Sequence, residues 1–144
     1  MNEYLKTGKV PRNTRRLLKE KQMDHWTESS QLQFQMISRA RNNQQDYSWN
    51  LLPDGTLVYY ARGEEEPITG LLAKEEAEQL MDQLKQAKFW EMKAYYGIPE
   101  TKGGDFFLLK AQEGELTKEV IFEAYAPDLI VSLKEFSAQF LENH

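Results

Sequence analysis

The sequence predicts an α+β fold, in which an antiparallel sheet of about five strands and two long helices on one of its faces form a two-layer sandwich. Three observations favour this class. Several segments alternate apolar and polar residues with the period of two that is typical of strands. Two other segments repeat apolar residues at helical spacing. Most predicted strands are joined by links short enough for hairpins, which favours an antiparallel sheet. The expected order along the chain is helix, three strands, helix, two strands and helix.

Length and composition limit the possible classes of protein. The chain has 144 residues, no cysteine and a net charge of −5. This length predicts one domain that can bury a core without a disulfide or a metal. The lack of cysteine excludes a disulfide scaffold, a cysteine-ligated metal site and a thiol enzyme. No run of about 18 apolar residues predicts a membrane span, and the N-terminus has no hydrophobic signal core, so we expect a cytoplasmic protein.

Positive charge is concentrated in residues 1–24, whose net charge of +4 leaves −9 for the remainder. Residues 1–28 are therefore expected to form a basic arm before a single domain of residues 29–144. Pro11 favours a first helical turn, so the arm should contain a short helix with Trp26 as an anchor beyond its end. The arm could contact nucleic-acid phosphates or another anionic surface, lie across the acidic body, or remain solvated. Its cations are Lys6, Lys9, Arg12, Arg15, Arg16, Lys19 and Lys21.

The first three strands are expected between residues 31 and 61. A polar turn at 39–45 separates the first strand from the second. Pro53-Asp54-Gly55 then predicts a type I turn with a bulge, because glycine suits the left-handed position that follows such a turn. This loop pairs Trp49 with Tyr59. The alternating segments are residues 31–36, 47–51 and 57–61.

The second half begins with an acidic loop at 62–67, which we expect to be solvated rather than to bind a metal, because adjacent carboxylates point in different directions. A helix over 74–88 carries acidic residues early and lysines late, in agreement with the helix dipole. Residues 89–92 should plug the sheet, and 98–104 should form a loop. Strands follow at 106–111 and 116–125, and a final helix begins at Pro127-Asp128.

Residues 45–142 resemble a family of small bacterial α+β domains of unknown function. The shared features are Pro53-Asp54-Gly55, Gly70 before a helix, Phe89-Trp90 and Tyr96 after that helix, and a finish of two strands and a helix. The resemblance implies a fold for this region and no activity. It does not include the basic arm.

The sequence contains no recognisable catalytic motif. His25 and His144 are its two histidines, and no serine lies in a Gly-x-Ser-x-Gly context. The phosphate-binding motifs Gly-x-x-x-x-Gly-Lys-Ser/Thr and Gly-x-Gly-x-x-Gly are both absent from the sequence. One loop candidate combines Asp105 with Tyr95, Tyr96 and Lys102 near a strand end, although Asp105 could instead tie down the loop through backbone hydrogen bonds. We expect no enzymatic activity, no cofactor and no metal.

We expect a non-catalytic protein-binding module that acts as an adaptor, a regulator or a neutralising partner. If the helices cover the sheet face that holds Trp49 and Tyr59, the opposite face stays open. Tyrosines there would supply rigid contact area, and acidic residues would favour a basic partner. The alternatives are ordinary cross-strand packing, or coverage of that face by the N-terminal helix. The expected open-face residues are Val58, Tyr60, Glu119, Ile121, Glu123 and Tyr125.

Two other functions were weighed against protein binding. The first is association with nucleic acid or an anionic surface through the basic arm. The second is a small enzyme centred on Asp105.

Overall fold

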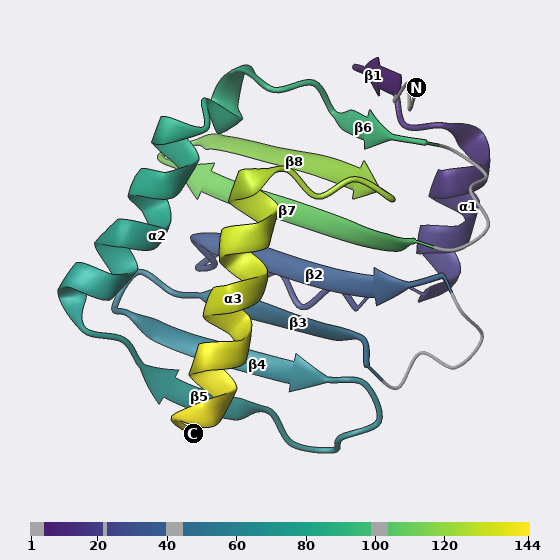
Figure 1. The fold of residues 1–144 in the computed structure, drawn as a ribbon. Coiled ribbons are helices and arrows are strands. Elements are labelled where there is room, and N and C mark those ends of the chain that lie inside the picture. The colour runs from purple at the N-terminus through teal and green to yellow at the C-terminus, as the bar shows by residue number, and fades with distance from the viewer. Residues whose placement is uncertain (1–4, 22, 40–44, 99–103) are drawn as a thin grey trace.

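A computed structural model describes residues 5–21, 23–39, 45–98 and 104–144, and it confirms the predicted α+β class. Figure 1 shows a single sheet with helices along it. In chain order the elements are β1 (Leu5–Thr7), α1 (Arg12–Lys21), β2 (Leu32–Ser38), β3 (Tyr47–Leu51), β4 (Thr56–Ala61), β5 (Ile68–Leu71), α2 (Lys74–Gln86), the 3₁₀ turn η1 (Phe89–Glu91), β6 (Tyr95–Gly97), β7 (Asp105–Glu113), β8 (Leu116–Glu123) and α3 (Asp128–Glu142).

The sheet differs from the prediction of about five antiparallel strands. Within the described residues it has eight strands in the order β1-β6-β8-β7-β2-β3-β4-β5, and β6 runs parallel to β8 while the other pairs are antiparallel. The unpredicted strands β1, β5 and β6 are only three or four residues long. Apolar and polar residues must alternate over more positions than this before a strand can be recognised from sequence. These three strands are therefore defined by pairing with neighbouring strands and not by their own sequence.

The predicted hairpin around Pro53-Asp54-Gly55 is confirmed. Trp49 lies opposite Tyr59, and the backbone N–H of Leu52 donates to the Thr56 carbonyl at 2.8 Å. Gly55 has a φ of +93°, which is the left-handed conformation expected of the bulge residue.

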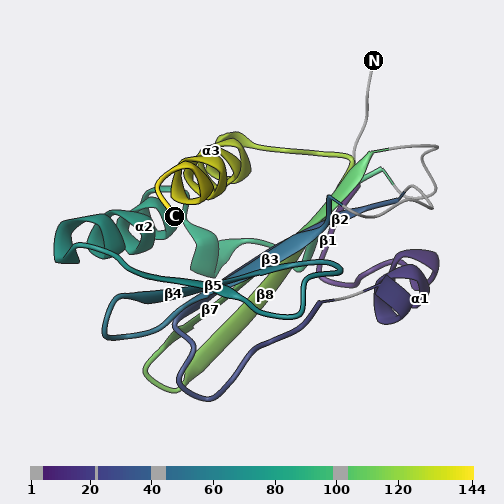
Figure 2. The same ribbon diagram turned by 90° about the horizontal axis from the view of Figure 1, so that it is seen from below.

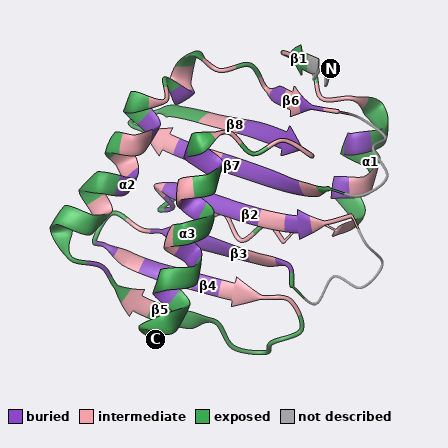
Figure 3. Ribbon diagram, viewed as in Figure 1, coloured by how far each residue is buried: buried purple, intermediate pink, exposed green. Residues whose placement is uncertain are grey.

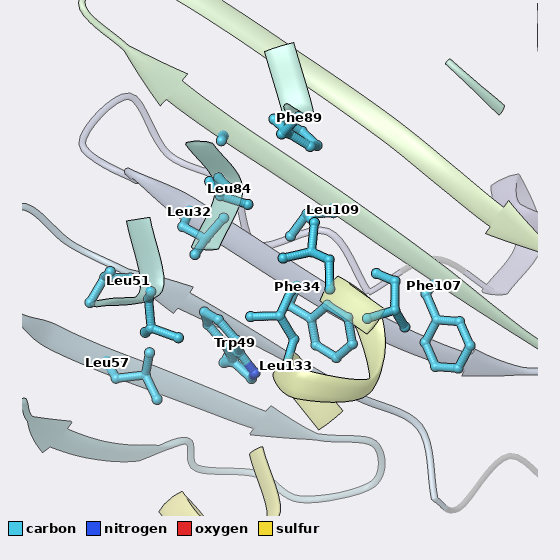
Figure 4. Packing of buried hydrophobic residues seen from close by; sticks show 14 of the residues in the cluster. Leu32, Phe34, Trp49, Leu51, Leu57, Leu84, Phe89, Phe107, Leu109 and Leu133 are labelled. Carbon is cyan, nitrogen blue, oxygen red and sulfur yellow. The ribbon is translucent and has the colours of Figure 1, made fainter. Parts of the chain in front are cut away.

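The two faces of the sheet are covered by different elements. Figure 2 shows α2 and α3 on one face and α1 on the other, so α1 adds a partial third layer to the predicted two. The larger core lies under α2 and α3, and Figure 4 shows how side chains from the central strands meet there. Trp49 is fully buried at its centre, and its indole N–H donates to the Ser137 hydroxyl at 2.8 Å.

A second, smaller core lies on the α1 side. The buried half of α1 contributes Leu18, which packs against the sheet, and the coloured ribbon in Figure 3 shows α1 as exposed and buried in alternating turns. The sheet residues of this cluster are Ile37, Tyr95, Phe106, Leu108 and Ile121. The sheet is therefore buried on both faces over β7 and β8.

Candidate functional site

The sheet face opposite α2 and α3 is covered, so the expectation of an open binding surface there is wrong. The ring of Tyr60 stacks on His25, with the two ring centroids 3.7 Å apart. Ile121 is 7% exposed and Glu123 is 1% exposed. Val58 and Glu119 are half-buried. These residues share the face that was predicted for them, but the N-terminal part of the chain occupies it.

Tyr125 does not lie on that face. It packs against the larger core, where its ring approaches those of Tyr96 and Phe122. The preceding residue, Ala124, has a φ of +55°, and this left-handed residue ends the regular alternation of β8. The prediction that Tyr125 shares a face with Tyr60 assumed an unbroken strand.

The carboxylate of Glu123 joins α1 to the sheet. Its Oε1 accepts a hydrogen bond from the Thr14 hydroxyl of α1 and another from the Tyr95 hydroxyl at 2.7 Å. Its Oε2 forms an ion pair with the Arg39 guanidinium. Because a buried carboxylate must be paired and hydrogen-bonded, these partners make Glu123 a structural anchor rather than a recognition residue.

The segment after α1 is held under β2 and β3 by side-chain amides. The backbone N–H of Met23 donates to Gln35 Oε1 at 3.1 Å, and Asn50 Nδ2 donates to the His25 carbonyl at 2.6 Å. Gln35 is 0% exposed and Asn50 is 3% exposed. The polar positions of these two strands therefore bind the backbone of their own chain instead of facing water.

The predicted cations of the basic arm divide into two groups. Lys21 is turned toward the sheet, where its Nζ donates to the carbonyls of Ser38 and Arg39 at 3.0 and 3.2 Å. The other six side chains are exposed, and none of them forms an ion pair with any residue that the structure describes. These six are Lys6, Lys9, Arg12, Arg15, Arg16 and Lys19.

The loop candidate around Asp105 is not brought together as predicted. Tyr95 points to the α1 side and binds Glu123, whereas the neighbouring Tyr96 packs against the larger core. Lys102 lies outside the described residues. Asp105 is half-buried at the start of β7, opposite Ser38.

Asp105 has an electrostatic neighbour on the α3 side. The pKa of Tyr47 is raised, chiefly by burial, while a hydrogen bond with Ser137 opposes the shift and the negative charge of Asp105 adds to it. This arrangement keeps Tyr47 protonated near neutral pH, so the phenol is a hydrogen-bonding group rather than a base. An enzyme centred on Asp105 stays the second alternative to a protein-binding module.

A groove made of two adjoining hollows runs along one side of α2, between this helix and the loops around residues 31, 53 and 112. Its two hollows have volumes of about 340 and 410 Å³. The first reaches Trp90, beyond the end of the helix, and the second reaches Lys74 at its start. We call the whole surface from Lys74 to Trp90 the α2 groove. The residues common to both hollows are Gln31, Pro53, Met81 and Lys85.

The wall opposite α2 is made of loops that are hydrogen-bonded to one another. The N–H of Gln31 donates to the Leu51 carbonyl at 2.8 Å, and the N–H of Gln112 donates to the Gln31 carbonyl at 3.0 Å. The N–H of Leu72 donates to the Gly55 carbonyl at 2.9 Å. A Cβ on Gly55 would lie 3.1 Å from the Leu72 carbonyl oxygen, so glycine permits this close approach. The groove is therefore preformed, because hydrogen bonds within the chain hold its wall in place.

The chemistry of the α2 groove is apolar at its floor and acidic at its rim. Met81 and Trp90 are half-buried, and Leu71 is 73% exposed at one end. The charged residues that line the groove are all exposed. The Nζ atom of Lys74 lies 4.0 Å from Oε1 of Glu78. The lining contains five carboxylates and two ammonium groups, so its net charge is −3. The carboxylates are those of Glu28, Asp54, Glu78, Asp82 and Glu113, and the ammonium groups are those of Lys74 and Lys85.

The Asp54 carboxylate has a defined orientation at this rim. It accepts a hydrogen bond from the Thr56 N–H at 2.9 Å, and this bond is the main reason that its pKa is lowered. Asp54 thus stays anionic over a wide pH range.

Two residues of the α2 groove lie in elements that the sequence predicts. Met81 is within the predicted helix over 74–88, and Trp90 is in the segment predicted to plug the sheet. Both side chains reach the core but keep one side toward the groove. The proximity of three loops that lie far apart in the sequence has no local sequence signal.

In the ranges that the structure describes, every helix is too short or too polar to span a bilayer. In the same ranges, no three His, Asp or Glu side chains are grouped as metal ligands. No protein-family model matches the chain, and the comparison with curated proteins finds no similar sequence, so the resemblance of residues 45–142 to bacterial domains stays a prediction.

Proposed function

We propose that the chain is a non-catalytic protein-binding module that holds a basic, partly apolar segment of its partner in the α2 groove. The observation that carries this proposal is the combination of an apolar floor and a rim of five carboxylates in one preformed groove. The expected partner chemistry, a protein with a basic surface, is that predicted from the sequence. The site is different, because the sheet face first considered for it is covered.

The size of the groove sets the size of the segment. A helix of 13 residues is about 20 Å long, and an extended peptide rises about 3.3 Å per residue. An extended segment of about six residues therefore matches the length of the groove. Its apolar side chains would contact Met81 and Trp90, and its lysines or arginines would lie near the carboxylates.

The physical roles of floor and rim differ. Burial of apolar and aromatic side chains supplies most of the affinity in such sites. Exposed charges chiefly raise the association rate and select the sign of the partner, and both effects weaken as salt is added. The wall loops are already hydrogen-bonded, so little conformational entropy is lost from the groove on binding.

The proposal is tested by selecting binders from a displayed library of random 12-residue peptides, followed by fluorescence polarisation with the best sequences. We expect enrichment of lysine and arginine interleaved with apolar residues. The variant Glu78→Lys/Asp82→Lys should weaken binding of these peptides by more than tenfold, because it reverses two charges at the rim. Met81→Glu should have a comparable effect by placing a charge in the floor.

The matched control is Glu76→Lys/Glu135→Lys. It makes the same change of charge at two exposed residues outside the α2 groove, Glu76 on α2 and Glu135 on α3, which line a separate hollow between these helices. Circular dichroism should show that all variants are folded. Equal loss of affinity in the control and the rim variant would contradict the proposal, as would a library that yields no basic peptide.

A further inference from the structure

The outer surface of α1 carries an ordered row of cations that the proposed function does not use. Arg15 and Arg16 follow Arg12 by three and four residues and precede Lys19 by four and three residues, so all four lie on one side of the helix. All four side chains are exposed. We call these four residues the α1 ridge. Lys9 adds an exposed cation just before the helix.

The opposite side of α1 is fully engaged, which fixes the direction of the ridge. Leu18 is 3% exposed in the smaller core, and Thr14 is 3% exposed, with its hydroxyl bound to Glu123. Lys21 is bound to the carbonyls at the end of β2. Contacts at the first, middle and last turns of the helix thus hold the ridge outward.

The four ridge cations form no ion pairs with the residues that the structure describes. Carboxylates are also present on this side of the molecule. Glu20 is exposed on the flank of the same helix, and Glu119 lines a hollow of about 350 Å³ that it shares with Arg15 and Lys19. Arg12 and Arg16 do not line this hollow.

The structure points to a second binding site: we infer that the α1 ridge binds the phosphate backbone of duplex nucleic acid. The ridge runs from Arg12 to Lys19, which is seven residue steps or about 10 Å along the helix, and the major groove of B-DNA is about 12 Å wide. Arginine matches phosphate oxygens with paired N–H donors. Since the ridge consists of cations alone, the binding should not depend on base sequence.

Other polyanions fit the ridge less well. A helix that lies on a membrane buries an apolar side in the lipid, but the leucines of α1 face the sheet. Proteins that bind single strands stack bases on aromatic side chains, and α1 contains no aromatic residue. The net charge of −9 outside residues 1–24 repels nucleic acid from the rest of the surface, so contact is directed to this side.

The test is fluorescence anisotropy of a labelled 20-base-pair DNA duplex titrated with the full chain between 50 and 200 mM salt. If all four cations contact phosphates, log K should fall against log salt with a slope of about −3.6. Arg12→Gln/Arg16→Gln should reduce the size of this slope by about 1.8 and lower the affinity at 50 mM salt by about tenfold or more. A duplex of different sequence should bind equally well.

The matched control is Lys88→Gln/Lys93→Gln, which removes two exposed cations far from α1 in the sequence and should leave duplex binding unchanged. The rim variant Glu78→Lys/Asp82→Lys should keep the contribution of the ridge, so this inference and the proposed function fail separately. Absence of duplex binding at 50 mM salt, or equal loss in the ridge and control variants, would overturn the inference. Stronger binding to phosphatidylserine vesicles or to a single strand than to the duplex would also overturn it.

Discussion

The two faces of the sheet are buried by different kinds of contact. The face under α2 and α3 is closed by apolar and aromatic side chains, with Trp49 and Phe34 at 0% exposure. The opposite face is closed in part by polar groups, including Gln35 and Glu123, which bind the N-terminal segment and α1. Apolar burial tolerates small shifts, whereas a buried amide or carboxylate needs a partner in a defined place. We therefore expect the first face to set overall stability and the second to fix the position of α1.

The largest expected effect is on the apolar face. Trp49→Ala removes a fully buried indole and its hydrogen bond to Ser137, and the loss should be about 3–5 kcal/mol in the free energy of unfolding. Urea denaturation measures this change. Trp26→Ala is the control on the opposite face, where the half-buried ring lies under Lys110, and it should cost much less. Similar losses in both variants would remove the distinction between the faces.

The next effect concerns the ionic contact of α1. Glu123→Ala leaves Arg39, Thr14 and Tyr95 without their shared acceptor, and it should cost about 3 kcal/mol. Hydrogen–deuterium exchange should rise in α1 and stay low in α3. The double variant Arg39→Met/Glu123→Met should recover part of the stability, because no charge is then left unpaired. Uniform exchange across both helices would show that Glu123 supports the whole fold and not α1 alone.

A smaller effect is expected from the amide contacts. Gln35→Leu removes the acceptor of the Met23 N–H, and an unsatisfied buried N–H costs about 1–3 kcal/mol. The local signature is faster exchange in residues 23–27. A variant as stable as the wild type, with unchanged exchange in this segment, would show that water replaces the glutamine without loss.

The smallest effect is the pH dependence of the His25 contact. Burial lowers the pKa of His25 below 6.5, although the charge of Asp24 partly opposes the shift. The unfolded chain then binds a proton more readily than the folded one, so this contribution to stability is present above pH 6.5 and is lost as pH falls through the folded pKa. His25→Phe keeps the stack on Tyr60 and removes the titration. The wild type should therefore lose more stability than the variant between pH 7.5 and 5.0, and parallel pH profiles would exclude this role.

Elements whose residues carry a local pattern can be predicted from the amino-acid sequence alone. The hairpin at Pro53-Asp54-Gly55, its register and the two long helices follow from turn chemistry and from periods of two and 3.6 residues. The positive charge of residues 1–24 was also evident without a structure. Each of these properties depends on residues that are close in the chain.

Which surfaces are free depends on contacts between distant parts of the chain. Polar residues such as Gln35 and Asn50 indicate a wet face when only the strand is considered, but a distant segment supplies their hydrogen-bond partners. The α2 groove likewise arises where loops around residues 31, 55 and 112 meet. Burial and proximity depend on long-range contacts, so no local pattern specifies them. For the same reason the short strands β1, β5 and β6 became visible only beside their neighbours.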